Sequence, residues 1–399
     1  MNEIYTEQQK LKFKIQELLI GIIFILQVLN NSQLPVQYET MSIFIRIMIF
    51  ILLLFLFIGT LTMTFDIREM VIVLSIGILF FLSYHNSGNE MFLVTLLLIA
   101  GSRELNIQSI ARSMLFGQII GVTVVFFLML FSIIPNVQTV RLEAVRYSLG
   151  FLNPNTISSY LLAIIIKYSV AYREKMDIKI IILLNIIILV TVRFTDSRTN
   201  LILFLIFDFL LLFYFILKRS KKNMEFYNIL LKRGTKLTVL FSIALTWLVG
   251  KYFYFGSSFW LTLNKLFSAR LSSIYSFQQQ YGYSVFGQKI DKISGYMADQ
   301  LGMSAKILDN AYAQLAIEYG IVVLIVFIVF YFKSINIFFY QNISILLISA
   351  FLYALSSFNG GNIFDWDKNI TLILGGVLLI QNGFNRENCN GKNRNNNIS

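Results

Sequence analysis

The stretch MSIFIRIMIFILLLFLFIGTLT occupies positions 41–62 and decides the class of protein. Arg46 is its one charged residue. A helix of about 20 mostly apolar residues is long enough to cross the hydrocarbon core of a bilayer. Backbone groups in that core find no water to bond, so an apolar segment there has to be helical. The stretch therefore predicts a transmembrane helix.

Similar apolar runs recur along the whole chain of 399 residues. Hydrophobic residues make up 57% of the sequence, charged residues 14%, and the mean hydropathy is +0.70. A soluble protein of this size could not bury so much apolar surface, whereas lipid solvates it. The sequence predicts an all-α, polytopic transmembrane helix bundle that forms one integral membrane domain over residues 1–399. The twelve predicted spans are 15–30, 41–62, 69–85, 90–102, 110–134, 154–172, 178–193, 199–217, 235–252, 311–332, 335–357 and 369–382.

The distribution of basic residues predicts the orientation of the bundle. Lys10, Lys12 and Lys14 precede the first span, and most of the other basic residues fall in alternate segments between spans. Cytoplasmic segments of membrane proteins are enriched in Lys and Arg. Both termini are therefore predicted to be cytoplasmic. This bias also accounts for most of the formal charge of +12, so the predicted partner is the lipid bilayer and not nucleic acid.

Residues 251–310 form the one long segment on the predicted outer side. Residues 260–280 show helical spacing of apolar positions, and the aromatic residues from Tyr252 to Trp260 are typical of a membrane interface. We interpret the segment as a large extracytoplasmic loop with an amphipathic helix on the outer leaflet, roofing a cavity. Simple anchoring at the interface explains the same pattern.

Arginines recur on the outer side, where the charge bias disfavours them. Arg141 and Arg146 lie in one short outer loop, and Arg193 and Arg198 flank another. They can be solvated loop charges or anchors for lipid headgroups. Alternatively, they form an anion site, because the planar guanidinium binds phosphate oxygens in pairs.

Four outer stretches combine such charges with the predicted starts of helices. Helix capping explains Asp196, Asn155 and Asp309 well, but not the arginines beside them. Helix N-termini and arginines together favour anions. The stretches are Gly150-x-x-Asn153-Pro154-Asn155 after Arg146, Asp196-Ser197-Arg198-Thr199, Leu266-Phe267-Ser268-Ala269-Arg270 with Phe286-Gly287 downstream, and Asp309-Asn310-x-Tyr312 with Gly320.

The order and setting of these four stretches resemble the Wzy-type polysaccharide polymerases, within the broader O-antigen polymerase and ligase group. The resemblance covers about 140–332, the number of spans and the single large outer loop. Ala269 departs from the family pattern, which has glycine before the arginine, although a small residue is kept.

The resemblance implies a multi-pass enzyme of the bacterial cytoplasmic membrane that joins oligosaccharide repeat units carried on undecaprenyl diphosphate into a surface polysaccharide, such as a capsule or O-antigen. It implies a chain-length regulator and other polysaccharide-assembly proteins as partners. The implied roles are diphosphate binding by Arg146, Arg198 and Arg270, with Arg141 and Arg193 in reserve; acid–base catalysis by Asp309, Asp196 or Glu143, with Glu318 as a buried alternative; and support from Asn153, Asn155, Asn310 and Tyr312.

No motif of soluble enzymes occurs in the sequence. The only cysteine, Cys389, lies in the polar tail, and the only histidine, His85, has no metal-spaced partner. The acidic residues are scattered and lie beside arginines or predicted caps, so neither a metal nor a cofactor is predicted.

The main alternative is a flippase or transporter of the same lipid-linked oligosaccharide. Such a protein should lack a large outer loop, show repeat-related halves and carry charges deep in its spans. We find no internal repeat here. Asp208 is the acid that lies in mid-span, and we interpret it as a polar contact between helices. A scaffold protein, the third class, would need no outer arginines.

Overall fold

The computed structural model describes residues 2–61, 67–141, 144–220, 223–293, 303, 306–360 and 362–381. Helices dominate these residues, as predicted, and one antiparallel hairpin accompanies them. The helices are α1 (Asn2–Asn30), α2 (Leu34–Gln37), α3 (Glu39–Leu61), α4 (Ile67–Ser87), α5 (Met91–Ser102), α6 (Ile107–Leu130), α7 (Pro154–Ala171), α8 (Ile178–Thr195), α9 (Arg198–Ser220), α10 (Met224–Tyr252), α11 (Ser258–Leu266), α12 (Arg270–Tyr281), α14 (Ala311–Gln314), α15 (Ile321–Tyr340), α16 (Ser344–Ser356) and the helix Ile370–Gln381.

Shorter elements complete the chain. Strands β1 (Gln138–Arg141) and β2 (Ala144–Tyr147) form the hairpin, where the sequence predicted only a loop. The π-helix η1 (Leu315–Tyr319) and the 3-10 helix η2 (Ser357–Asn359) are the other two.

Among the residues that the structure describes, seven helices are long and apolar enough to cross a membrane: α1, α3, α4, α6, α8, α9 and α15. Only 17–39% of their most apolar windows is buried inside the protein. The apolar side chains that face outward could not be solvated by water over so large an area. The chain is therefore a polytopic helical membrane protein, with lipid around these helices.

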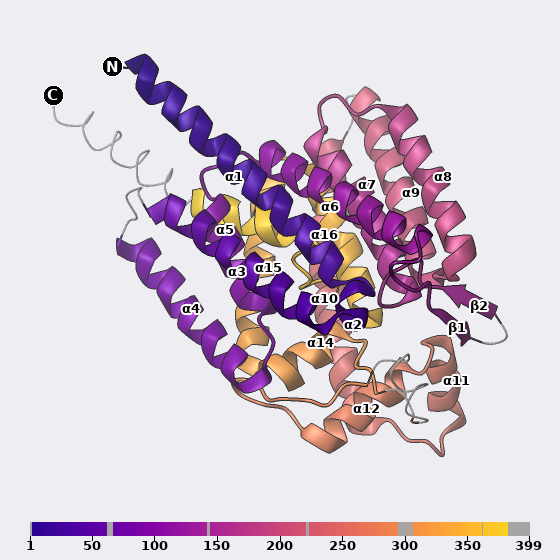
Figure 1. The fold of residues 1–399 in the computed structure, drawn as a ribbon. Coiled ribbons are helices and arrows are strands. Elements are labelled where there is room, and N and C mark those ends of the chain that lie inside the picture. The colour runs from indigo at the N-terminus through magenta and orange to yellow at the C-terminus, as the bar shows by residue number, and fades with distance from the viewer. Residues whose placement is uncertain are drawn as a thin grey trace.

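The segments that connect the helices lie at two ends of the bundle, where hydrogen bonds and ion pairs join them. At one end, Lys12 of α1 pairs with Glu104, and Gln381 donates to the carbonyl of Arg103. We call this the terminal end. At the opposite end, Gln33 donates to the carbonyl of Phe151, and the hairpin, α11 and α12 lie there as well (Figure 1). We call this the hairpin end.

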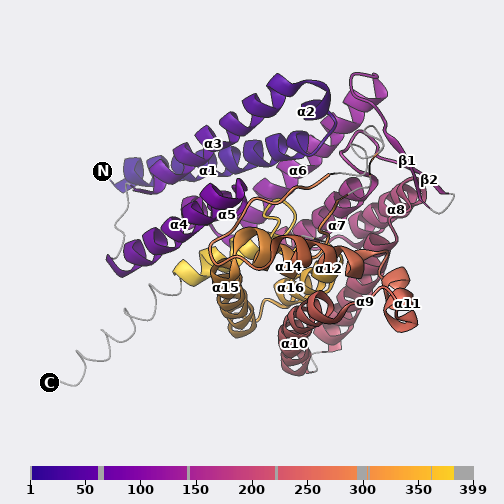
Figure 2. The same cartoon turned by 90° about the horizontal axis from the view of Figure 1, so that it is seen from below.

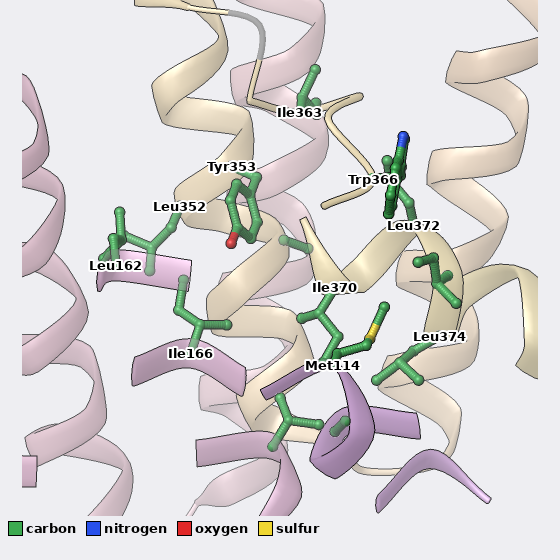
Figure 3. Packing of buried hydrophobic residues seen from close by; sticks show 14 of the residues in the cluster. Met114, Leu162, Ile166, Leu352, Tyr353, Ile363, Trp366, Ile370, Leu372 and Leu374 are labelled. Atoms are coloured by element: carbon green, nitrogen blue, oxygen red, sulfur yellow. The ribbon is translucent and has the colours of Figure 1, made fainter. Parts of the chain in front are cut away.

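The centre of the bundle is made by helices that lipid does not reach. Nearly every side chain of α7 and α16 is buried, and the same holds for most of the helix Ile370–Gln381. Figure 3 shows Leu162 and Ile166 of α7 packing near Leu352 of α16 and Ile370. Seen at right angles to Figure 1, the long α1 and α3 lie on one side of this centre (Figure 2).

Two of these central helices are too short to cross the bilayer. α16 has 13 residues, and Ile370–Gln381 belongs to the 10–17 residue class. At about 1.5 Å per residue each extends roughly 20 Å, against about 30 Å for the hydrocarbon core. Because Gln381 is anchored at the terminal end, the turns over 362–369 stop short of the hairpin end. We call these residues the recessed loop. Irregular backbone at such depth occurs only where protein buries it or where it lines a cavity.

Three predicted boundaries are wrong. The spans 311–332 and 335–357 do not part at Lys333, because α15 continues through Lys333 to Tyr340 before the turn to α16. Gly320 separates α15 from η1 and α14, so the predicted helical start at 311 is a short interrupted segment. The predicted amphipathic helix over 260–280 is two helices, α11 and α12, which are parted by left-handed backbone at Ser268 and Ala269.

Candidate functional site

Arg146 lies at the centre of a polar network that joins the hairpin to the starts of α7 and α9. Its Nε donates to the carbonyl of Thr195 at 2.7 Å, and its Nη2 donates to Oδ1 of Asn155 at 2.6 Å. Ser197 donates to the same Asn155 oxygen, and Asn200 donates to Ser197. We call Arg146, Asn155, Ser197 and Asn200 the hairpin network.

The hairpin network holds the fold at this place. Only 8% of Arg146 is exposed, and its two short bonds go to neutral acceptors of the protein. Pro154 lies in the first turn of α7, as the sequence indicates. The cap is Asn153, which accepts from the backbone of Asn155, and not the predicted Asn155. The predicted role of Arg146 in binding a diphosphate therefore receives no support from this geometry.

The neighbouring candidates lie at the surface. Nε of Arg198 and Oδ1 of Asp196 are 3.1 Å apart, with 62% and 25% of the side chains exposed. Asp196 has left-handed backbone and closes α8, although the sequence suggested that it begins the next helix. Such exposed pairs contribute little stability. Arg193 is also exposed. The third predicted acid, Glu143, lies outside the described residues, as does the side chain of Arg141.

A second group of charges lies where α12, η1 and the preceding loops meet. Nη2 of Arg270 is 3.8 Å from Oδ2 of Asp309, and Nζ of Lys292 is 2.6 Å from Oε2 of Glu318. Glu318 is 5% exposed and also accepts from Gln314 and Asn89. We call Arg270, Lys292, Asp309 and Glu318 the charge cluster. It brings together Arg270 and Asp309, two residues singled out from the sequence.

Backbone packing explains why Glu318 is held so firmly. The residues around Gly287 cross the end of η1, where the amide of Gln288 donates to the carbonyl of Glu318 at 2.9 Å. A Cβ on Gly320 would lie 2.5 Å from the carbonyl oxygen of Val285, and the φ of +103° favours glycine as well. Gly287 and Gly320, which the sequence placed in separate stretches, therefore meet beside the cluster. A π-turn such as η1 is frequent at functional sites.

Asp309 is an acid of the charge cluster whose pKa is shifted by its surroundings. Desolvation among the surrounding protein groups raises the pKa of its carboxyl, even though 46% of its side chain is exposed. The positive charges of Arg270 and Lys292 act against this rise. A carboxylate with a raised pKa is a better proton acceptor near neutral pH than an ordinary aspartate.

The recessed loop adds a second set of charges that the sequence analysis missed. Nζ of Lys368 is 2.7 Å from Oδ2 of Asp365. Asp367 is 2% exposed, and it accepts from the hydroxyl of Tyr160 at 2.6 Å and from Asn31 at 3.1 Å. These bonds connect the loop to α7 and to the end of α1.

A buried lysine on α7 forms hydrogen bonds to the backbone of the recessed loop. Nζ of Lys167 is completely buried and donates to Gln118 and to the carbonyl of Asp367, both at 2.7 Å. Removing water from a charge is costly unless such partners replace it. Lys167 therefore fixes the backbone of the loop at the depth where Asp367 meets Tyr160.

The charge cluster and the recessed loop are close enough to interact electrostatically, because the positive charge of Lys292 acts on the carboxylates of both Asp309 and Asp365. Together they form one polar centre of opposite charges inside an apolar bundle. The sequence contained a signal for the missed half: a run rich in Gly, Asn and Asp over 359–369, between apolar stretches too short to cross a bilayer.

The two predicted supporting residues on α14 are buried. Asn310 caps α14 by accepting from the amide of Ala313, and it donates to the carbonyl of Phe358 just before the recessed loop. The hydroxyl of Thr246 donates to Asn310, which connects the same point to α10. Tyr312 is 1% exposed within the core. Asn310 therefore joins the start of α14 to α10 and to the residues before the recessed loop.

The predicted contact for Asp208 is confirmed. Nδ2 of Asn185 on α8 donates to Oδ2 of Asp208 on α9 at 2.8 Å, so this acid joins two helices. No family model, no curated protein and no solved structure matches this chain.

Proposed function

We propose that this protein is a membrane glycosyltransferase that joins oligosaccharide repeat units carried on undecaprenyl diphosphate into a surface polysaccharide. The observation that carries the proposal is the meeting of Arg270, Lys292 and Asp309 at the hairpin end, beside the recessed loop. The proposed reaction needs cations to stabilise the diphosphate leaving group and a carboxylate to accept the proton of the sugar hydroxyl. The resemblance of the outer stretches to polysaccharide polymerases supports the same reaction.

The proposed step is a displacement at an anomeric carbon. The hydroxyl oxygen of the acceptor repeat unit forms a bond to the anomeric carbon of the donor, while the bond from that carbon to the diphosphate oxygen breaks. Asp309 accepts the hydroxyl proton. Arg270 and Lys292 stabilise the negative charge that grows on the departing diphosphate, and such preorganised charges lower a barrier strongly in a site that excludes water.

The proposed orientation places the hairpin end outside the cell and both termini in the cytoplasm of a bacterium. The seven long apolar helices would cross the membrane together with α5, α7 and α10. The short helices α16 and Ile370–Gln381 would form the last two of the twelve predicted segments, meeting at the recessed loop within the membrane and returning the chain to the cytoplasm. In a Cys389→Ser background, an impermeant thiol reagent should label Ser258→Cys but not Ser220→Cys in intact cells. Both serines are exposed. Labelling of the cysteine at 220 alone would reverse the orientation.

The reaction itself is tested with the purified protein in liposomes. Addition of an undecaprenyl-diphosphate-linked repeat unit should give longer lipid-linked chains and free undecaprenyl diphosphate. Deletion of the gene should leave single lipid-linked repeats on the outer side and no long surface polymer. A protein that is correctly inserted and still gives no chain extension from the repeat unit of its own cell would contradict the proposal.

A flippase for the same lipid-linked unit is the second candidate. The recessed loop between two short helices favours it, because transporters place interrupted helices around their binding sites. The two functions differ in what the deletion mutant accumulates. Repeats held on the cytoplasmic face would establish the flippase.

A further inference from the structure

A groove of about 900 Å³ is lined mostly by residues of α3, α4 and α5, and Gln27, Asn30 and Trp366 complete its lining. These three helices lie at one edge of the bundle (Figure 1). The walls are mainly apolar, and they include Phe50, Leu54 and Phe57 from α3 with Leu74, Gly77 and Ile78 from α4.

The groove suits a hydrocarbon chain. More than half of the surface of Phe50, Leu74 and Ile78 is exposed, and these residues lie on helices that face lipid. The volume lies in the range of about 300–1,000 Å³ that ligand pockets occupy. A chain lying along the groove would cover apolar side chains that the protein itself leaves open.

Six polar side chains interrupt this apolar surface: Gln27, Asn30, Arg46, Tyr84, Asn89 and Glu90. Arg46 lies about two turns into α3 and is the one basic residue among the described residues that line the groove. A charge within a transmembrane segment is costly unless it serves a partner. The partner that suits an arginine facing lipid is an anion, and a phosphate matches its planar fork.

The groove also reaches the polar centre. Asn89 lines its end and donates to Oε1 of Glu318 at 3.3 Å. Trp366, between Asp365 and Asp367 of the recessed loop, lines it too. A lipid whose chain occupies the groove would therefore present its headgroup at the edge of the proposed reaction site.

We propose that this groove binds the polyisoprenyl chain of the lipid diphosphate substrate and that Arg46 contacts one of its phosphates. The inference rests on the proposed function and adds a binding site to it. The proposed ligand is a single-chain isoprenoid lipid, because the groove lies between two helices and leads to a proposed site for a diphosphate. An ordinary phospholipid is the alternative that the test must separate.

Gly77 and Arg46 offer two independent variants. A Cβ at Gly77 would meet only Cδ2 of Leu96, at 3.6 Å, so Gly77→Leu places bulk in the groove without a clash and improves helix propensity. Gly59→Leu is the matched control, because a Cβ there meets nothing within 4 Å and Gly59 does not line the groove. For Arg46→Ala the control is Lys251→Ala, an exposed basic residue at the hairpin end of α10.

Binding is measured by native mass spectrometry of the purified full-length protein with undecaprenyl diphosphate lacking any sugar. We expect Arg46→Ala to weaken binding about tenfold or more, which is the effect of losing one charged hydrogen bond. Gly77→Leu should also weaken binding, because its side chain occupies space in the groove, and the two controls should bind as the wild type does. Dioleoylphosphatidylglycerol should not displace the isoprenoid lipid. Unchanged binding by both groove variants, or equal competition by the phospholipid, would overturn the proposal.

The same preparations are assayed for chain extension, which separates the two proposals. If the wild-type protein extends chains and the groove variants bind the lipid normally, the groove proposal is wrong and the polymerase proposal stands. If the wild-type protein binds the lipid, the two groove variants bind it weakly and no chain is extended, the groove proposal stands and the polymerase proposal is wrong.

Discussion

Arg146 and Arg270 occur in similar sequence surroundings, yet the structure uses them differently. Arg146 is 8% exposed and makes bonds of 2.6 and 2.7 Å to neutral acceptors. The side chain of Arg270 is 15% exposed and donates to the carbonyl of Phe267 at 3.5 Å, but it also faces the carboxylate of Asp309 at 3.8 Å, and nearly half of that acid is exposed. An arginine in short bonds to neutral protein groups holds the fold, whereas one beside a partly open acid can bind a substrate anion. The distances and partners therefore distinguish two arginines to which the sequence analysis gave one predicted role.

The largest expected effect separates the two regions by activity. Asp309→Asn should lower chain extension by about 10²- to 10⁴-fold, because the amide cannot accept the hydroxyl proton. Asp196→Asn should cost far less, since Asp196 forms an exposed pair with Arg198 near the hairpin network. Chain extension is measured in liposomes with equal amounts of folded protein. Equal losses in the two variants would remove the distinction between the regions.

Arg146→Ala tests the structural half of the comparison. Loss of its two charged hydrogen bonds leaves the carbonyl of Thr195 without this donor and should destabilise the fold by about 3 kcal/mol. Arg198→Ala should change stability by no more than about 0.5 kcal/mol, because the Arg198 side chain is 62% exposed. Thermal unfolding in detergent measures both. If the Arg146→Ala protein has normal stability but no activity, Arg146 binds the substrate instead of stabilising the fold.

Arg270 should show the opposite pattern. Arg270→Ala should lower turnover by about 10²-fold, with little change in melting temperature, because its charge stabilises the leaving group. Arg270→Lys keeps the charge but loses the paired donors, so it should recover only part of the activity. The loss should fall on turnover more than on apparent substrate affinity. A large drop in melting temperature for Arg270→Ala would instead make it a second structural arginine.

The comparison also shows which features can be predicted from sequence. The apolar runs gave the membrane class, and the helix start at Pro154 followed from local chemistry. The capping residues were predicted wrongly by one or two positions, because Asn153 and Asn310 cap the helices instead of Asn155 and Asp309. The role of Arg146 could not be predicted, because its partner Thr195 is 49 positions away and approaches only in the folded bundle. The recessed loop was missed for a related reason: its depth depends on how short α16 is, and the apolar pattern was assigned a full span. Gly287 and Gly320 were noticed separately, but their contact depends on the crossing of two distant segments.

The smallest expected effect concerns pH, and it tests whether Lys292 and Asp309 belong to one site. Desolvation raises the pKa of Asp309, and the charges of Arg270 and Lys292 limit that rise. Activity that needs the carboxylate should therefore fall as the pH drops through this raised pKa. Lys292→Gln removes one limiting charge, so the acidic limb of its pH–rate profile should move to higher pH, by less than about one unit.

The control for the pH experiment is Lys289→Gln, an exposed lysine in the same segment, which should leave the limb in place. Stability should change in the opposite direction to activity. A carboxyl whose pKa is higher in the folded than in the unfolded state stabilises the fold at low pH, and this contribution is lost as the pH rises through the folded pKa. The wild type should therefore gain melting temperature, relative to Asp309→Asn, over the interval in which it loses activity. If activity and this relative stability fall together on acidification, or if Lys292→Gln leaves the limb unmoved, Asp309 is not the titrating group.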